Sequence, residues 1–91
     1  MINIRKLVLD VLKPLEPDII DFSSAIALAN DGINIHVVVS ELDKNTETLR
    51  ITISGQGLDV NRIKCAIEEA GASLHSIDEV EVENVTPSIT A

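Results

Sequence analysis

The side chains that could carry acid–base or metal chemistry are few and widely spaced. They comprise two histidines, His36 and His75, one cysteine, Cys65, and 15 acidic residues. Histidine titrates near neutral pH and binds metals, but both histidines fall on predicted edge strands at opposite sides of a sheet. Two strands at about 4.8 Å spacing would separate them, so we expect no shared ion within one chain. The lone cysteine offers neither an internal disulfide nor the paired thiolates of a soft-metal site.

Asp10 is the most unusual carboxylate, because it lies in a predicted central strand between Val8 and Leu12. One interpretation is structural: the third strand runs antiparallel to the first, which would place Arg50 opposite Asp10 as an ion pair. The alternative is that Asp10 helps to bind a cation or a ligand on the open face of the sheet. The other candidates for such a site are His75, Asp78 and Glu79.

Further carboxylates gather near the two predicted edge strands: Glu41, Asp43, Asp78, Glu79, Glu81 and Glu83. Hard divalent cations such as calcium bind several oxygen ligands, and edges that meet between subunits would pool them. No EF-hand spacing occurs. A divalent cation such as calcium is therefore the one cofactor that the sequence suggests, without a defined set of ligands. The alternative is a solvated acidic edge that discourages unwanted strand pairing.

The composition limits the partners. The chain has 91 residues and a formal net charge of -8, with 15 acidic against 7 basic side chains, and this charge repels phosphate backbones. Phe22 is the only aromatic residue, so bases have almost nothing to stack on, and we expect no nucleic-acid partner. Charged residues and prolines interrupt the apolar stretches, which predicts no signal peptide, no membrane partner and a cytoplasmic protein.

Apolar spacing predicts six elements in the order strand, helix, strand, strand, helix, strand. Alternation predicts strands at 4–12, 33–42, 49–54 and 73–83, and helical spacing predicts helices at 17–29 and 60–70. In the first helix Pro17 is expected in the first turn. The second helix has Asp59 as its expected N-cap and Gly71 as its expected C-cap. Leu74 and Ile77, and then Val80 and Val82, do not share one parity, which predicts a bulge at 77–79.

This order of elements is the split βαβ arrangement called ferredoxin-like, an α+β fold. Right-handed crossovers place both helices on one face of a four-stranded antiparallel sheet with strand order 4-1-3-2. We predict one domain over 1–83 and a flexible C-terminal tail over 84–91, which is small, polar and contains Pro87.

Four segments together resemble one protein family. They are LVLDVLKP at 7–14 followed by Glu16 and Pro17, DGINI at 31–35, TETLRITI at 46–53, and HSIDEV at 75–80. The family consists of short archaeal proteins catalogued as domain of unknown function two-hundred-eleven. The resemblance implies a ferredoxin-like fold, an archaeal cytoplasmic protein and self-assembly. It implies no activity, because the family has no assigned biochemical role.

Two groups of apolar side chains lack cover in this topology. They are Ile20 and Leu28 on the first helix, and Val8, Leu12 and Val38 on the open face of the sheet. Two such groups on a small domain predict a protein interface, here a homo-oligomer. No catalytic constellation accompanies them. The leading hypothesis is a non-enzymatic, self-assembling regulatory or ligand-binding module with sites between subunits. The alternatives are a carboxylate-based cation-binding protein or metal-dependent enzyme, and an acidic adaptor for a basic protein partner.

Overall fold

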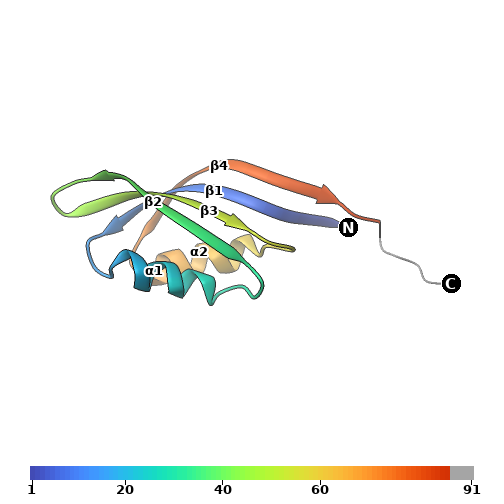
Figure 1. Ribbon diagram of the computed structural model, residues 1–91, viewed down its shortest axis with the longest axis horizontal. Coiled ribbons are helices and arrows are strands. Elements are labelled where there is room, and N and C mark those ends of the chain that lie inside the picture. Colours follow the sequence, from blue (N-terminus) through green and yellow to red (C-terminus); the bar gives the residue numbers. More distant parts are fainter. Residues whose placement is uncertain (87–91) are drawn as a thin grey trace.

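The computed structural model describes residues 1–86. The elements are β1 (Ile2–Pro14), α1 (Ile19–Ala27), β2 (Asn34–Leu42), β3 (Thr46–Ser54), α2 (Val60–Glu69) and β4 (Ser73–Asn84). All neighbouring strands are antiparallel and their order is β2-β3-β1-β4, which is the predicted order read from the other edge. Both helices lie on one face of the sheet (Figure 1). The predicted ferredoxin-like fold is confirmed.

The sheet is longer than the helices that cover it (Figure 1). The start of β1 and the end of β4 continue beyond the helices as a two-stranded ribbon, and the β2–β3 hairpin extends from the opposite end. Most of the predicted tail, 87–91, lies outside the described residues. Asn84 is the last residue of β4, and the N–H of Val85 donates to the carbonyl of Met1 at 2.8 Å. No helix in residues 1–86 is long and apolar enough to cross a membrane.

The core lies between the helices and the two central strands. Its members are almost completely buried aliphatic side chains and the single phenylalanine: Leu7, Leu9, Val11, Phe22, Ile26, Leu49, Ile51, Ile53, Leu58, Ile63, Ile67 and Ala72. The strand members all have odd numbers, because alternate residues of a strand point to the same face. Burial of each large side chain contributes roughly 1.5–3 kcal/mol, and this layer holds the helices against the sheet.

Both helices begin at a capping aspartate. Asp18 Oδ1 accepts the N–H of Asp21 at 2.8 Å, and Asp59 Oδ1 accepts the N–H of Arg62 at 3.1 Å. The prediction that Pro17 lies in the first turn of α1 is wrong, because capping by Asp18 leaves the proline outside the helix. The Glu16–Pro17 peptide bond is cis. At the end of α2 the C-cap is Ala70, and Gly71 follows with φ of 86°, a conformation that suits glycine.

Three register irregularities interrupt the pairing of β1 with β4. Val8 pairs with Glu79 while Leu9 pairs with Ile77, so Asp78 is an extra residue; the bulge predicted at 77–79 is confirmed. A second irregularity leaves out His75, because Asp10 pairs with Ser76 and Val11 with Leu74. The third lies on β1, where Ile4 pairs with Val82 and Lys6 with Glu81, which leaves out Arg5. Bulges bend strands and redirect side chains, and all three concern ionisable residues.

Candidate functional site

Asp10 lies opposite Arg50 in the register of β1 and β3, as predicted. The ion pair expected between them does not appear among the salt bridges of residues 1–86. Instead, Asp10 Oδ2 lies 3.9 Å from Nδ1 of His75, with side-chain exposures of 35% and 70%. A contact this long and this exposed contributes little to stability. The structure therefore brings two of the predicted site residues together, but loosely.

The other two predicted site residues have partners of their own. The hydroxyl of Ser76 donates to Asp78 Oδ1 at 2.6 Å, and Lys6 Nζ lies 2.7 Å from Glu79 Oε2. The four candidates therefore do not converge on one point. Within residues 1–86 no group of three or more His, Cys, Asp or Glu side chains is arranged to hold a metal ion. The predicted calcium-type site is not assembled by the described part of one chain.

The Lys6–Glu79 pair leads to a pH-dependent prediction. The hydrogen bond and the charge of Lys6 lower the pKa of Glu79 below its usual value. A lowered pKa in the folded state means that the pair stabilises the fold above the ordinary glutamate pKa of about 4.3 and that this stabilisation disappears as pH falls through the folded pKa. We expect a carbon-detected NMR titration to show the Glu79 carboxyl titrating below 4.3. In Lys6→Met its pKa should rise, and an unchanged midpoint would contradict the pairing.

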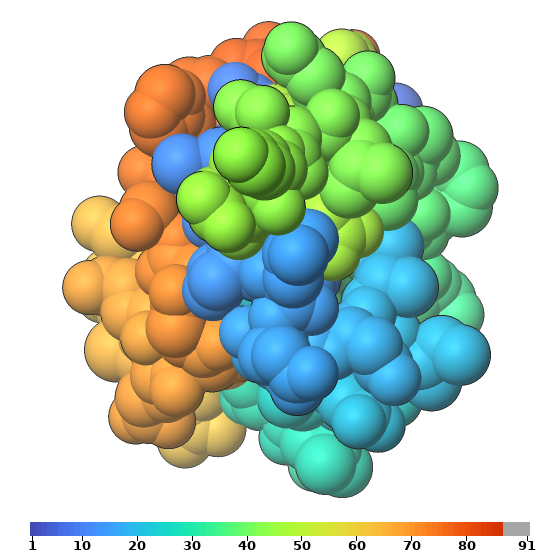
Figure 2. All heavy atoms as spheres, turned by 90° about the vertical axis from the view of Figure 1, so that its left-hand side faces the viewer, coloured from blue at the N-terminus to red at the C-terminus, as the bar shows by residue number. Residues whose placement is uncertain are grey.

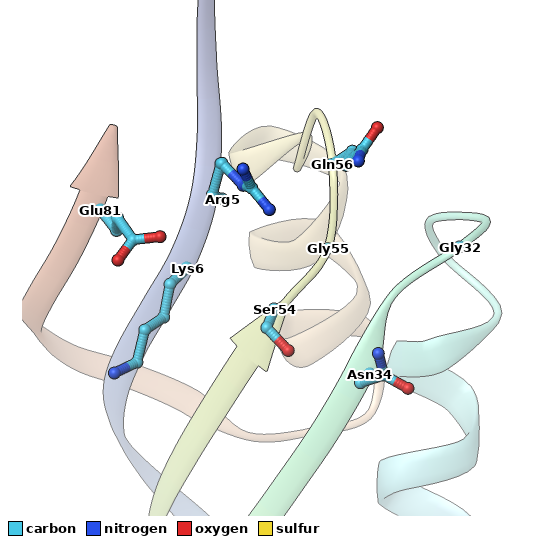
Figure 3. A pocket seen from close by; sticks show the side chains of 8 residues that line it. All are labelled: Arg5, Lys6, Gly32, Asn34, Ser54, Gly55, Gln56 and Glu81. Carbon is cyan, nitrogen blue, oxygen red and sulfur yellow. The ribbon is translucent and has the colours of Figure 1, made fainter. Parts of the chain in front are cut away.

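A polar pocket of about 630 Å³ lies on the sheet near the start of β2 and the end of β3, shown in Figure 3. Its lining residues come from all four strands and from two loops: Arg5, Lys6, Gly32, Asn34, Ser54, Gly55, Gln56 and Glu81. Arg5 and Lys6 are neighbours on β1, and neighbours on a regular strand point to opposite faces. Both line this pocket, at the place where the irregularity at Arg5 interrupts the pairing with β4.

The two glycines of the pocket lie where loops meet. A Cβ added at Gly55 would lie 2.9 Å from the carbonyl oxygen of Gly32, which is too close for any other residue without a shift of backbone. The loop after β3 is also bonded to β1, because the N–H groups of Gly55 and Leu58 donate to the carbonyls of Arg5 and Ile4 at 3.0 and 2.9 Å. These contacts hold the loop beside Arg5 on β1.

Charged side chains of both signs surround this pocket. Arg5 Nη1 donates to Glu83 Oε2 at 2.5 Å, and this hydrogen bond, with smaller help from Glu81, raises the pKa of Arg5 above its ordinary value. Lys6 forms a salt bridge with Glu79. In contrast, the side chain of Glu81 has no hydrogen bond or salt bridge within residues 1–86. Its carboxylate is turned toward β1 (Figure 3).

Neither Lys13 nor the pocket was predicted from the sequence. The side chain of Lys13 is completely buried at the end of β1, where Nζ donates to the carbonyls of Pro14 at 2.7 Å, Leu15 at 3.2 Å and Pro17. Nζ also lies 2.9 Å from Glu47 Oε1. The ammonium therefore organises the loop between β1 and α1, which lies at the centre of Figure 2. A signal existed: Lys13 has the odd parity of the buried strand residues.

The apolar residues predicted as an interface differ in exposure. Four of them leave apolar surface open: Leu12 at 37%, Ile20 at 73%, Leu28 at 86% and Val38 at 43%. Val8 lies on the open face as expected but is only 4% exposed. Its register partners Thr52 and Glu79 flank it on both sides, so Val8 is covered within the chain and adds no exposed apolar surface.

The fold and the pocket define a ferredoxin-like α+β domain with a polar pocket on its sheet. A family model described as "Uncharacterized ArCR", DUF211, matches residues 5–86. An uncharacterized protein of Methanocaldococcus jannaschii is 49% identical over 82 residues, which cover 88% of this chain and 82% of that protein. The chain belongs to the DUF211 family, as its sequence motifs indicated, and this family has no described function.

Proposed function

We propose that the protein is a non-enzymatic, ligand-binding module that assembles head to tail with copies of itself. The observation that carries this proposal is the distribution of exposed apolar side chains. Two groups of them lie on opposite lateral sides of the domain, here called the α1–β2 side and the β4 side. Figure 2 shows α1 and β2 at one side of the molecule and α2 and β4 at the other.

The α1–β2 side is apolar where a solvated surface would be charged. Between Ile19 and Ala27 the helix α1 has a single charged residue, Asp21, and Ile20 and Leu28 are 73% and 86% exposed. The adjacent strand β2 exposes Val39 and Leu42. Helix α2 is different, because its exposed positions include Arg62, Lys64, Glu68 and Glu69. Exposed contiguous apolar surface of this kind marks interaction sites.

The β4 side presents Ile77, Val80 and Val82, each about half exposed. Their register partners on β1 are the core residues Leu9 and Leu7 and the partly buried Ile4, so these side chains point to the helix-covered face. Helix α2 does not reach the end of the sheet (Figure 1), which leaves them uncovered. β4 is also an edge strand, and an edge has unpaired backbone groups that can bind another strand.

Charge favours contact between unlike sides. β4 carries Asp78, Glu79, Glu81 and Glu83, so a symmetric contact of β4 with a second β4 would place acidic residues against one another. In β2 the only acidic residue is Glu41. A contact between the β4 side of one copy and the α1–β2 side of the next avoids most of this repulsion. Such a heterologous contact forms a ring when the rotation closes.

The native mass tests the proposal. We expect light scattering at micromolar concentration to give a mass several times that of the 9.8 kDa chain. Because the contacts are apolar, this mass should persist in 1 M salt, where charge attraction is screened within about 3 Å. A chain that is monomeric across the micromolar range would contradict assembly. Dissociation by salt would show instead that charge pairing, and not apolar contact, holds the copies together.

A further inference from the structure

We propose that the pocket shown in Figure 3 binds a small zwitterion, a molecule in which a carboxylate and an ammonium group lie close together, such as a free α-amino acid. All the lining residues belong to one chain. The proposal therefore goes beyond self-assembly and does not require it. Three features of the pocket support it: a guanidinium with unused donors, an unpartnered carboxylate, and a balance of charge that disfavours ions of a single sign.

Arg5 provides the contact for the carboxylate. Its guanidinium has five N–H donors in a planar fork that matches a carboxylate, and one nitrogen is engaged by Glu83. The guanidinium extends from β1 toward the end of β3, where Ser54 lies (Figure 3). Ser54 and Asn34 add a hydroxyl and an amide on that side of the pocket. A ligand carboxylate would find several charge-assisted and neutral donors there.

Glu81 provides the contact for the ammonium. The neighbouring carboxylates Glu79 and Glu83 are paired with Lys6 and Arg5, whereas Glu81 has no ion-pair partner within residues 1–86. It lies across β1 from Ser54 (Figure 3), near enough to Arg5 to raise the pKa of that guanidinium. A carboxylate and a guanidinium therefore face the same hollow without neutralising each other by direct contact.

The charge balance excludes simpler ligands. Arg5 and Lys6 contribute two positive charges near the pocket, and Glu79, Glu81 and Glu83 contribute three negative charges. The charges around the pocket are negative in sum, and the chain has a net charge of -8. An inorganic anion is therefore repelled. A simple amine would leave Arg5 without a new partner. A zwitterion satisfies both groups, and the amides of Asn34 and Gln56 favour a polar side chain on it.

The pocket is preformed on its loop side. The close approach of Gly55 to the carbonyl of Gly32, together with the bond from the Gly55 N–H to the Arg5 carbonyl at 3.0 Å, fixes the two loops against β1. A site that is already ordered loses less conformational entropy when a ligand binds. A ligand as small as an amino acid has few contacts, so this preorganisation is needed for measurable affinity.

The test begins with the assembled wild-type protein and the standard amino acids, screened by thermal shift and then by calorimetry. We expect saturable binding of at least one amino acid with a polar side chain. Its N-acetyl derivative, which lacks the ammonium, and its α-amide, which lacks the carboxylate, should each bind at least about tenfold more weakly. Failure of every amino acid to bind, or equal binding of the N-acetyl derivative, would overturn the proposal.

Two variants locate the site. Arg5→Gln and Glu81→Gln should each weaken binding of the amino acid at least about tenfold. The matched controls are Lys44→Gln and Glu41→Gln, which make the same changes of charge near the β2–β3 hairpin at the other end of the sheet, and these should bind normally. Because Arg5 and Glu81 are exposed, far-UV circular dichroism should show both variants folded. Tighter binding by Glu81→Gln would show an anion site, and unchanged binding by both variants would place the ligand elsewhere.

Discussion

Replacing Lys13 with methionine is expected to lower the free energy of unfolding by about 3–5 kcal/mol, the usual cost of removing one partner of a buried ion pair. Methionine fills a similar volume, so the loss measures the ammonium and not a cavity. Its removal leaves the carbonyls of Pro14, Leu15 and Pro17 without their donor and leaves Glu47, whose side chain is 15% exposed, without its counter-charge.

The magnitude follows from how completely the ammonium is enclosed. Lys13 has no exposed surface, and an ammonium has three donors that here are surrounded by four oxygen atoms. Buried carbonyls that lose a hydrogen bond cost about 1–3 kcal/mol each unless water replaces the donor. Lys13 is therefore a structural residue.

Unfolding in urea measures this effect. Far-UV circular dichroism is the appropriate signal, because Phe22 is the only aromatic residue and the chain has no Trp or Tyr. All variants are compared at one protein concentration, since assembly makes apparent stability concentration-dependent. The control Lys44→Met, in an exposed turn, should change the free energy by no more than about 0.5 kcal/mol. The double variant Lys13→Met with Glu47→Leu should recover part of the loss, because no unpaired charge remains. A single Lys13→Met variant as stable as the wild type would contradict this role.

The same residue shows where sequence reasoning succeeds and where it ends. Alternation in β1 is strong enough to predict the strand, the buried parity and the antiparallel register that places Asp10 opposite Arg50. Parity also assigns Lys13 to the buried face. The charge of Lys13 predicts the opposite, an exposed side chain, because a lysine is buried only where partners surround it. Those partners come from the loop after β1 and from β3, and no local pattern reports such an arrangement.

The pocket was not predictable for a related reason. A regular strand would point Arg5 and Lys6 to opposite faces, so no spacing in the sequence suggests that they line one cavity. They do so at an irregularity in the pairing with β4, where the paired residues Glu81 and Val82 lie more than 70 positions further along the chain. The parity change between Ile77 and Val80 predicted one bulge correctly, because apolar residues on both sides of the bulge reveal the change. No such change of parity among apolar residues indicates the irregularity at Arg5.

The proposed head-to-tail assembly predicts that two single variants, each defective alone, complement each other when mixed. Leu28→Lys places a charge on the α1–β2 side, and Val82→Lys places one on the β4 side. Each should abolish the large assembly, because an unpaired charge in an apolar contact costs several kcal/mol and lowers the association constant by about 100-fold or more. Each variant alone should therefore be largely monomeric at micromolar concentration.

In the mixture each variant still has one intact side, and the two intact sides are of opposite kinds. An equimolar mixture should therefore form a species of two chains, one of each variant, and no larger assembly, which light scattering and native mass spectrometry distinguish from both monomer and ring. The control Cys65→Lys, on the exposed surface of α2, should assemble fully. A symmetric contact gives the opposite result: a variant altered on the unused side would assemble normally alone, and mixing would add no species. The mixture thus decides between a heterologous and an isologous contact, because only a heterologous interface joins two different surfaces.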